Sequence, residues 1–264
     1  MSNPSHTHLV LIPSYNTGPK LLTTVQEART RWAPVWVVID GSDDGSEAPV
    51  EALAAADPQI KVMKLAVNQG KGSAVLHGLR AAHAAGFTHA MTMDADGQHP
   101  ADLIPQFMAT SLAQPGALVL GKPVFDASAP FERVCGRKLS NGAADIETLW
   151  AGIGDSLYGF RIYPIPPLLE VMESGPWMRR FDFDPEVAVR LCWKGLIPIN
   201  IDAPVKYFRK DEGGVSHYHY VRDNILISWM HSRLLLGLLL RLPMLLWRKL
   251  AAQPAPAQSN ERSF

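Results

Sequence analysis

The chain reads Met93-Asp94-Ala95-Asp96-Gly97-Gln98-His99-Pro100 directly after a short apolar run, residues 89–93, that predicts a buried strand. Two carboxylates one residue apart at a strand end cannot both pack in an apolar core, because each would be strongly destabilising if it stayed uncompensated. A hard divalent cation with oxygen ligands is the natural partner, and such a cation would in turn neutralise a phosphate. The stretch therefore predicts chemistry that combines a metal with a phosphate.

Apolar runs alternate with helical patterns on both sides of this stretch. Strands are predicted at residues 9–13, 35–39, 60–65, 89–93, 118–121 and 197–201, and helices at residues 19–31, 48–56, 71–85, 102–111, 133–150 and 185–192. Strands separated by helices are typical of a mostly parallel sheet with helices on both faces. Ligands of such sheets bind beyond the carboxyl ends of the strands. Asp40, Asn68 and Asp94 each follow a strand, so we expect them at one edge.

The composition suits one α/β domain with a sizeable core and an appendage, since 47% of the 264 residues are hydrophobic and 19% are charged. The formal net charge is zero, so the composition does not predict a nucleic-acid partner. Acidic residues outnumber basic ones in residues 1–205, and the balance reverses in residues 206–250. Two cysteines are too few for a disulfide framework, and residues 1–8 lack an apolar secretory signal. We therefore expect a cytoplasmic location.

Residues 224–249 form a second unusual segment, which is rich in leucine. Two arginines and a proline interrupt the run, whereas a spanning helix needs about 20 consecutive apolar residues. On a helix, four arginines project within an arc of about 100°; they are Arg222, Arg233, Arg241 and Arg248. A basic stripe opposite Leu and Trp is typical of a helix that lies in a bilayer interface. A core-packed or oligomerising helix and a spanning helix are the alternatives.

Several polar motifs carry a family resemblance because they follow one another in order and with sensible spacings. They occupy residues 12–16, 40–46, 68–74, 94–100, 155–161, 181–186 and 213–218. Together they resemble the motifs of family-2 glycosyltransferases. The string at 94–100 has the form typical of the dolichyl- and polyprenyl-phosphate sugar transferase branch. The resemblance implies a GT-A fold and an inverting transfer of a sugar from a nucleoside-diphosphate sugar to a lipid or polyprenyl-phosphate acceptor.

The resemblance also implies how the chain is divided. We expect a GT-A catalytic domain at residues 8–220, an amphipathic membrane-contacting helical segment at residues 221–250 and a disordered tail at residues 251–264. The basic, leucine-rich segment would hold the catalytic cleft at the inner face of the cell membrane as a peripheral protein. A homo-oligomer is compatible with this organisation.

Asp94, Asp96 and Gln98 are the predicted metal ligands. Residues two apart on a regular strand share one face, which places both carboxylates together. Asp96 is the expected direct ligand, Asp94 holds the metal or the ribose, and the resemblance implies Gln98 as a third oxygen. Mg²⁺ or Mn²⁺ would bridge the diphosphate and stabilise the departing nucleotide. A solvated acidic turn is the alternative interpretation.

Asp40 follows a β-branched strand and could accept hydrogen bonds from the base or ribose of a nucleotide. The alternative is a set of helix caps, which we expect for Asp43 and Asp44 in particular. The family's turn often carries two consecutive acids, whereas this chain has Ile39-Asp40. The resemblance adds further nucleotide-binding positions from the first strand motif, namely Pro13, Tyr15 and Asn16.

Gly70-Lys71-Gly72 opens a predicted helix. Glycines allow a ligand to approach the backbone closely, and a helix N-terminus favours anions, so Lys71 could reach a phosphate. The spacing is not that of a Walker A loop. A plain loop-to-helix turn is the alternative.

Three carboxylates are candidates for a general base, namely Asp155, Asp184 and Glu186. A hydroxyl acceptor would need such a base, whereas a phosphate acceptor is already anionic and needs none. Acids in a first helical turn are also favoured by the helix dipole alone. Candidate contacts to phosphate or acceptor are Arg133, Arg161 and His217. Surface ion pairs and a loop histidine without a role are the alternatives, and Trp177 is a candidate for an acceptor groove.

Two other functions fit parts of this pattern. A sugar nucleotidyltransferase also uses an α/β nucleotide fold with acidic metal ligands, but it usually has an early Gly-rich loop with a basic residue, which residues 12–16 lack. A membrane-bound scaffold that has lost catalysis is the non-enzyme alternative. The intact Asp94, Asp96 and Gln98 favour an enzyme.

Overall fold

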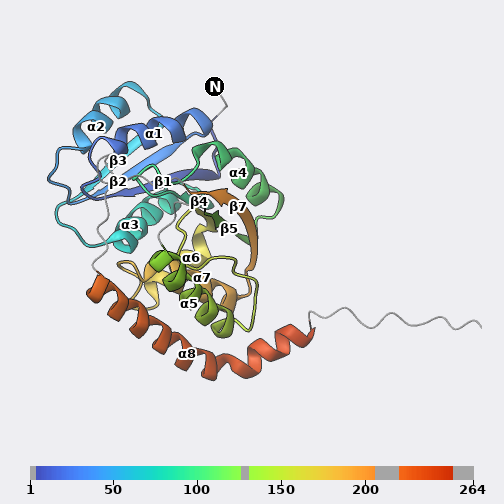
Figure 1. Cartoon of the computed structure of the whole chain (residues 1–264). Coiled ribbons are helices and arrows are strands. Elements are labelled where there is room, and N and C mark those ends of the chain that lie inside the picture. The colour runs from blue at the N-terminus through green and yellow to red at the C-terminus, as the bar shows by residue number, and fades with distance from the viewer. Residues whose placement is uncertain (1–3, 126–130, 206–219, 252–264) are drawn as a thin grey trace, which may run out of the picture.

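The computed structural model describes residues 4–125, 131–205 and 220–251, with the side chains of 131–135 and 220 left aside. In this part of the chain, seven strands form one sheet in the order β3-β2-β1-β4-β6-β5-β7 (Figure 1). Strands β1 to β4 run parallel to one another, as do β5 and β7, while β6 lies between β4 and β5 and is antiparallel to both. The predicted mostly parallel α/β sheet is confirmed. The antiparallel strand β6 was not predicted.

The bounds of the elements follow the predicted alternation closely. The strands are β1 (His8–Ser14), β2 (Val35–Asp40), β3 (Ile60–Leu65), β4 (His89–Thr92), β5 (Ala117–Val124), β6 (Arg161–Pro164) and β7 (Ile197–Pro204). The helices are α1 (Lys20–Arg31), α2 (Glu47–Ala56), α3 (Lys71–Ala84), η1 (Ala101–Leu103), α4 (Ile104–Ala113), α5 (Phe131–Glu147), α6 (Ile165–Glu173), α7 (Phe183–Lys194) and α8 (Tyr220–Ala251). Helix α6 was not predicted.

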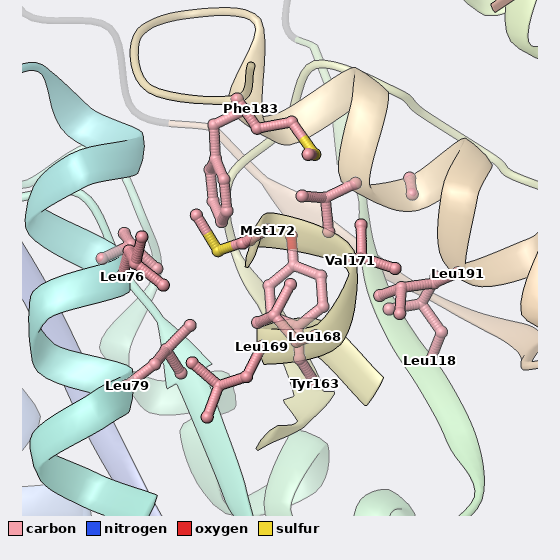
Figure 2. Packing of buried hydrophobic residues seen from close by; sticks show 14 of the residues in the cluster. Leu76, Leu79, Leu118, Tyr163, Leu168, Leu169, Val171, Met172, Phe183 and Leu191 are labelled. Carbon is pink, nitrogen blue, oxygen red and sulfur yellow. The ribbon is translucent and has the colours of Figure 1, made fainter. Parts of the chain in front are cut away.

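Helices cover both faces of the sheet, and the alternation of side chains along the strands supplies two apolar layers. In β1, Leu9 and Leu11 join the core on the side of α3, α6 and α7, whereas Val10 and Ile12 join the core on the side of α1 and α4. Because both faces are covered, every residue of β1 and β2 is buried. Figure 2 shows the first layer, with leucines of α3 opposite those of α6.

The carboxyl ends of the parallel strands gather the polar motifs at one edge, as expected. Strand β2 ends at Asp40, and the loops after β1, β3 and β4 contain residues 15–19, 66–70 and 93–100. Each of these loops leads into the helix that returns along a face of the sheet. The topology therefore brings motifs that are distant in the sequence to one place.

Helix α8 is a long helix that lies along α5 and α7 on one side of the domain (Figure 1). Its 32 residues would span about 48 Å at 1.5 Å per residue. One side of it packs into the core of the domain through Met230, Leu234, Leu238 and Leu245. The expected division at residues 220 and 221 stays a prediction. The expected tail lies outside the described residues from 252 onward, as does the motif at 213–218.

Candidate active site

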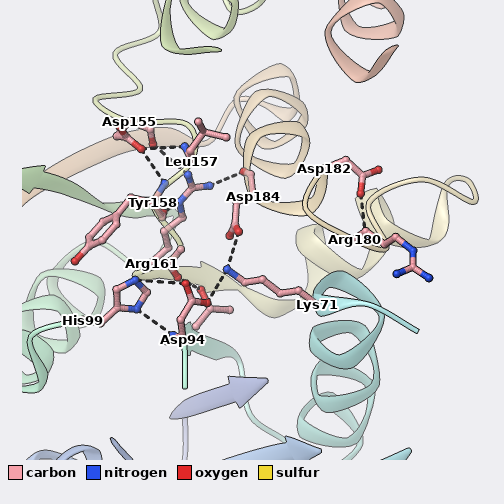
Figure 3. A network of polar contacts seen from close by, with 12 residues as sticks. Lys71, Asp94, His99, Asp155, Leu157, Tyr158, Arg161, Arg180, Asp182 and Asp184 are labelled. Atoms are coloured by element: carbon pink, nitrogen blue, oxygen red, sulfur yellow. Dashed lines mark hydrogen bonds and ion pairs between the residues drawn. The ribbon is translucent and has the colours of Figure 1, made fainter. Parts of the chain in front are cut away.

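Lys71 occupies the centre of the polar edge, between two carboxylates from different elements (Figure 3). Its Nζ lies 2.7 Å from Asp94 Oδ1 and 2.7 Å from Asp184 Oδ2. Lys71 begins α3, Asp94 follows β4, and Asp184 lies in the first turn of α7. Burial alone would lower the pKa of Lys71, but Asp184 and Asp94 outweigh it and raise the pKa above its ordinary value. Lys71 is therefore a permanent cation.

Gly159 lets the backbone approach this group of charges. A Cβ at Gly159 would lie 2.5 Å from Lys71 Nζ and 3.2 Å from Asp94 Oδ2, so a larger residue would fit only if the ammonium group moved. The Gly159 carbonyl accepts a hydrogen bond from Thr92 Oγ1 at 2.8 Å, which fixes the segment before β6 against the end of β4. We call Lys71, Asp94, Gly159 and Asp184 the Lys71 cluster.

Asp94 and Asp96 have opposite electrostatic environments. Burial would raise the pKa of Asp94, but the Lys71 ammonium lowers it below its ordinary value. Burial and then Asp94 raise the pKa of Asp96 to about 6. Among the described contacts, the carboxylate of Asp96 accepts one hydrogen bond, from the backbone N–H of Gln98 at 3.0 Å. Asp96 is thus an anion beside another anion.

This pair fits the predicted metal. The described residues contain no group of three His, Cys, Asp or Glu side chains arranged to hold a metal ion. Asp94 and Asp96 are two carboxylates, with the amide of Gln98 nearby in the same loop. A divalent cation would relieve the repulsion that raises the pKa of Asp96, and it prefers oxygen ligands. The assignment of Asp94, Asp96 and Gln98 as ligands stays a prediction.

His99 supports the Asp-x-Asp loop from within. Its Nδ1 accepts a hydrogen bond from the backbone N–H of Asp94 at 3.0 Å, and its ring packs edge-on against Tyr158. Burial lowers the pKa of His99 to about 4, so the ring is neutral at pH 7 and can accept this bond. His99 fixes the conformation of the loop.

Asp40 ties the end of β2 to the loop that precedes α3. Its two carboxylate oxygens accept hydrogen bonds from the backbone N–H groups of Gln69 at 2.9 Å and Gly70 at 2.7 Å. The side chain is buried, and burial raises its pKa although both amides oppose the shift. The structure therefore gives Asp40 a loop-fixing role. Its contact with a nucleotide stays a prediction.

The glycines at the start of α3 receive the protein's own backbone. A Cβ at Gly70 would lie 2.5 Å from the carbonyl oxygen of Arg179, and one at Gly72 would clash with the carbonyl of Met178. Ser73 donates its backbone N–H to Arg179 O at 3.1 Å. The segment before α7 therefore packs closely against both glycines, and a phosphate contact at this helix start stays a prediction.

The loops after β1 and β2 are joined by side chains. Asn16 Nδ2 donates to Asp43 Oδ1 at 2.7 Å, and the backbone N–H of Asp43 donates to Asn16 Oδ1 at 2.9 Å. Asp44 accepts from the backbone N–H of Gly18 at 2.8 Å. Asp43 and Asp44 therefore link loops. The N-cap residue of α2 is Ser46 rather than either of them, although Asp44 Oδ1 accepts from the backbone N–H of Ser46 at 3.1 Å and so holds the start of that helix. Of the other predicted nucleotide positions, Pro13 is buried in β1 and Tyr15 is half-buried after it.

Asp155 is not placed to act as a base, which corrects one expectation. Its Oδ1 accepts from Arg137 Nη1 at 2.5 Å and from the backbone N–H groups of Leu157 and Tyr158, and its Oδ2 accepts from Asn141 Nδ2 at 3.1 Å. The residue is buried. All of these donors hold the carboxylate in a structural position.

Arg161 is not placed to contact a phosphate, which corrects a second expectation. It is 0% exposed. Its guanidinium donates to the carbonyl oxygens of Tyr158, Asp155 and Asp184 at 2.6, 3.1 and 2.6 Å. Arg161 therefore holds the segment before β6 against the first turn of α7.

Glu186 is the third correction, because its carboxylate is occupied by two arginines. Arg190 Nε lies 2.8 Å from Oε1, and Arg233 of α8 contacts both oxygens at 3.1 and 2.9 Å. Trp177 stacks on Arg233, with the guanidinium carbon 3.8 Å from the ring centroid, and its place in an acceptor groove stays a prediction. Of the three predicted bases, only Asp184 keeps a buried oxygen, Oδ1, without a hydrogen-bond partner among the described residues.

Two predicted contacts lie beyond the described side chains. Arg133 is in α5, but its side chain is not described, and His217 lies outside the described residues. The sequence interpretation missed Gly159 and Arg137, although Gly159 stands inside the quoted motif at 155–161. It also missed Arg233 as the partner of Glu186, because no pattern links positions 47 residues apart.

Three arginines of α8, Arg233, Arg241 and Arg248, contact the domain, whereas the side chain of Arg222 is 55% exposed and pairs with Asp223 of the same helix. Most of the expected basic stripe therefore meets the domain. Arg241 stacks on Trp193 at 4.8 Å, and Arg248 donates to the carbonyl oxygen of Trp193 at 2.6 Å. The outer face is apolar, with exposed Val221, Ile225, Trp229, Leu236, Leu239, Leu240, Trp247 and Leu250. By length and composition, Val221–Ala251 could cross a membrane, and 17% of its most apolar window is buried.

Comparisons with known proteins agree with this geometry. The model of Glycosyl transferase family 2 matches residues 9–153. A protein of Mycolicibacterium smegmatis named polyprenol monophosphomannose synthase is 27% identical over 218 residues, which cover 80% of both chains. A protein of Micrococcus luteus named undecaprenyl-phosphate mannosyltransferase is 24% identical over 253 residues, which cover 87% of this chain and 99% of that one.

A solved structure shares the fold. It is glucosyl-3-phosphoglycerate synthase from Mycobacterium tuberculosis in complex with Mn²⁺, uridine diphosphate and glucosyl-3-phosphoglycerate. The TM-score is 0.61 at 17% identity, and the match covers 89% of this chain and 80% of that chain. The likeness shows that the chain has the GT-A fold.

Proposed function

We propose that this chain, which belongs to glycosyl transferase family 2 and is a glycosyltransferase, moves a sugar from a nucleoside-diphosphate sugar to a polyprenyl phosphate. An oxygen of the acceptor phosphate forms the new bond to the anomeric carbon. The bond from that carbon to the diphosphate breaks, and its electron pair leaves with the nucleoside diphosphate. A single displacement of this kind inverts the anomeric centre. The names of the two relatives support the acceptor class.

The ion pairs of the three candidate bases support a phosphate acceptor rather than a hydroxyl acceptor. Asp155 and Glu186 are buried, and their carboxylates are occupied by arginines. Asp184 is paired with Lys71. An anionic phosphate attacks without losing a proton, whereas a hydroxyl would need a free base. A site whose carboxylates are committed to cations suits the phosphate.

Asp94, Asp96 and Gln98 would hold Mg²⁺ or Mn²⁺. When bound, such an ion neutralises a diphosphate and favours its departure. The Lys71 ammonium adds a fixed positive charge beside Asp94. In a partly buried site this charge would stabilise the anionic leaving group without reorganising during the reaction. Asp96→Asn should therefore abolish turnover while the protein stays folded. Retained activity at a saturating metal concentration would contradict the assignment of Asp96 as a metal ligand.

The donor would lie over the edge formed by the loops after β1, β2 and β3. We propose that Pro13, Tyr15, Asn16 and Asp40 contact the nucleotide, with Asp40 acting partly through the loop that it fixes. Arg133 and His217 are proposed to contact phosphate. Arg161 is not proposed to contact either the nucleotide or a phosphate.

We also propose that α8 holds the catalytic domain at the inner face of the cell membrane. The exposed leucines and tryptophans form one apolar face along the whole helix, while Arg233, Arg241 and Arg248 are turned toward the domain. A helix with one side packed on a domain and the other side apolar suits an orientation in the plane of the bilayer. Polyprenyl phosphates reside in that bilayer, so the acceptor would be reached from the surface.

A donor screen tests the proposal. The full chain is incubated with GDP-mannose, UDP-glucose and UDP-N-acetylglucosamine, with Mg²⁺ or Mn²⁺, in vesicles that contain undecaprenyl phosphate. We expect one nucleotide sugar to give a lipid-linked sugar and the nucleoside diphosphate in equal amounts. Release of pyrophosphate instead would indicate a nucleotidyltransferase and contradict the proposal.

A further inference from the structure

Arg233 of α8 makes a two-pronged contact with Glu186 of α7. Its Nη1 lies 3.1 Å from Oε1 and its Nη2 lies 2.9 Å from Oε2. Glu186 is 0% exposed, and its Oε1 also accepts from Arg190 of the same helix. Parallel contacts of this kind fix the relative orientation of two groups as well as their distance. The contact therefore sets where α8 lies relative to the start of α7.

The Arg233–Glu186 pair is shielded from solvent. Trp177 covers the guanidinium, whose carbon lies 3.8 Å from the ring centroid. The side chain of Arg233 is 11% exposed. Charges that are kept from water interact more strongly than they would on the surface. The pair is thus suited to transmit a displacement of α8 to α7.

Glu186 shares the first turn of α7 with Asp184. The carboxylate of Asp184 binds Lys71 Nζ at 2.7 Å, and its backbone carbonyl accepts from Arg161 Nη1 at 2.6 Å. Three cations therefore hold this turn: Lys71 from α3, Arg161 from β6 and Arg233 from α8. Loss of any one of them would let the turn shift or rotate, and the Asp184 carboxylate would move relative to Lys71.

The other polar contacts of α8 reach different places. Arg241 and Arg248 contact Trp193 at the far end of α7. His231 Nδ1 lies 2.8 Å from Glu147 Oε1 and its Nε2 lies 3.0 Å from Ser140 Oγ, both on α5. Of these four described side chains of α8, Arg233 is the one that binds the turn carrying Asp184.

We propose that Arg233 is a positioning residue, which acts through Glu186 to hold Asp184 against Lys71 and so couples the seating of α8 to the geometry of the active site. The coupling makes α8 part of the catalytic scaffold as well as a membrane contact. This inference rests on the proposed function for its kinetic consequence. Its structural consequence, a steadier first turn of α7, can be measured without turnover.

Arg233→Met and the matched control Arg241→Met test the proposal in the full chain on vesicles. Both changes remove one inward-facing arginine of α8 and leave its apolar outer face intact, so vesicle binding should be retained in both. We expect kcat to fall at least tenfold in Arg233→Met, with the KM for the lipid acceptor within twofold of wild type. Arg233→Lys should recover part of kcat. Equal kcat values in Arg233→Met and Arg241→Met would overturn the proposal.

Arg233→Met/Glu186→Gln separates positioning from stability. The double change removes a buried carboxylate that has lost one of its two arginine partners and keeps only Arg190, so the melting temperature should recover relative to Arg233→Met. We expect kcat to remain low because α8 still lacks its contact with the turn. Recovery of kcat together with stability would show that Arg233 only stabilises the fold, and would refute a positioning role.

Hydrogen exchange supplies the readout that does not need a substrate. The backbone amides of Asp184, Glu186 and Val187 should exchange at least fivefold faster in Arg233→Met than in wild type or Arg241→Met. Unchanged exchange at this turn would overturn the inference. If wild type transfers no sugar to any lipid phosphate, the proposed function fails, while the exchange result still decides whether Arg233 holds the turn.

Discussion

The ammonium group of Lys71 lies 2.7 Å from the carboxylate of Asp184, although the two residues are 113 positions apart in the chain. The contact joins the start of α3 to the start of α7 across the end of the sheet. Because Lys71 also binds Asp94 at 2.7 Å, one cation links the loop after β4 to both helices. The Lys71 cluster is therefore both a structural junction and the centre of the proposed active site.

Lys71→Met should lower both activity and stability. Without the ammonium, Asp94 and Asp184 are two uncompensated carboxylates, and the leaving diphosphate loses a fixed cation. We expect kcat to fall about 100-fold, as when one electrostatic contact to a transition state is removed. The free energy of unfolding should fall by about 1–3 kcal/mol, less than for a fully buried pair because Asp94 is partly exposed. Steady-state kinetics and urea unfolding measure the two effects, and wild-type kcat would remove Lys71 from the mechanism.

Gly159→Ala should damage the site more than the fold. The added Cβ would lie 2.5 Å from Lys71 Nζ, so the ammonium must move away from Asp94 or Asp184. We expect at least a tenfold loss of kcat. Gly142→Ala is the matched control, since a Cβ there meets nothing within 4 Å and should stabilise α5 by about 0.5–1 kcal/mol. Equal activity of the two variants would contradict the close approach at Gly159.

The stability of the protein should fall between pH 7.5 and pH 5 because of His8. Burial and then His89, which stacks on it at 4.3 Å, lower the pKa of His8 to about 4. The unfolded chain binds a proton near the ordinary histidine pKa of 6.5, so folding excludes that proton and stability is lost as the pH falls below this value. We expect a loss of about 2 kcal/mol from this residue at pH 5. Urea unfolding at both pH values measures it.

His8→Gln provides the comparison for this pH effect. Glutamine has no proton to gain in this range, and its amide can replace the hydrogen bond to Ser111, which lies 3.0 Å from His8 Nε2. The difference in unfolding free energy between pH 7.5 and pH 5 should therefore shrink in the variant. If wild type and His8→Gln lose the same amount, His8 is not the source.

Exchange of two exposed leucines of α8 should weaken membrane binding. Leu236 and Leu240 are 63% and 83% exposed on the outer face of the helix. Burying each leucine in lipid is worth about 1.5–3 kcal/mol at most, so Leu236→Gln/Leu240→Gln should reduce vesicle co-sedimentation about tenfold or more. Because Arg233, Arg241 and Arg248 contact the domain, and the exposed Arg222 is paired with Asp223, binding should depend little on anionic lipid. A strong requirement for anionic vesicles that disappears in high salt would contradict this orientation.

Much of the fold follows from local patterns. The parallel half of the sheet is predicted by apolar runs such as 9–13 and 35–39 and by the helical segments between them. The ordered motifs predict the family, and the matched family model confirms it. Strand β6 escaped prediction because its four residues, Arg161–Pro164, include a buried arginine that reads as polar. Only the assembled fold supplies the three carbonyl oxygens that satisfy that arginine.

The motifs predict which residues belong to the candidate site, but not the role of each residue. Asp155, Asp184 and Glu186 are equivalent acids in the sequence, and what distinguishes them is which cation each one meets. Those cations come from 18, 113 and 47 residues away. Likewise, a helical wheel predicts that the arginines of α8 share a face, but not that this face meets the domain.

The most direct test of the central claim compares two acceptors that differ only in the phosphate. The full chain in vesicles receives the donor identified by the screen, together with either undecaprenyl phosphate or undecaprenol, and the lipid-linked sugar is counted. We predict a sugar-linked product with undecaprenyl phosphate, equal in amount to the nucleoside diphosphate released, and none with undecaprenol. Equal or preferential transfer to undecaprenol would contradict the account, because it would require a free base that the committed carboxylates do not provide.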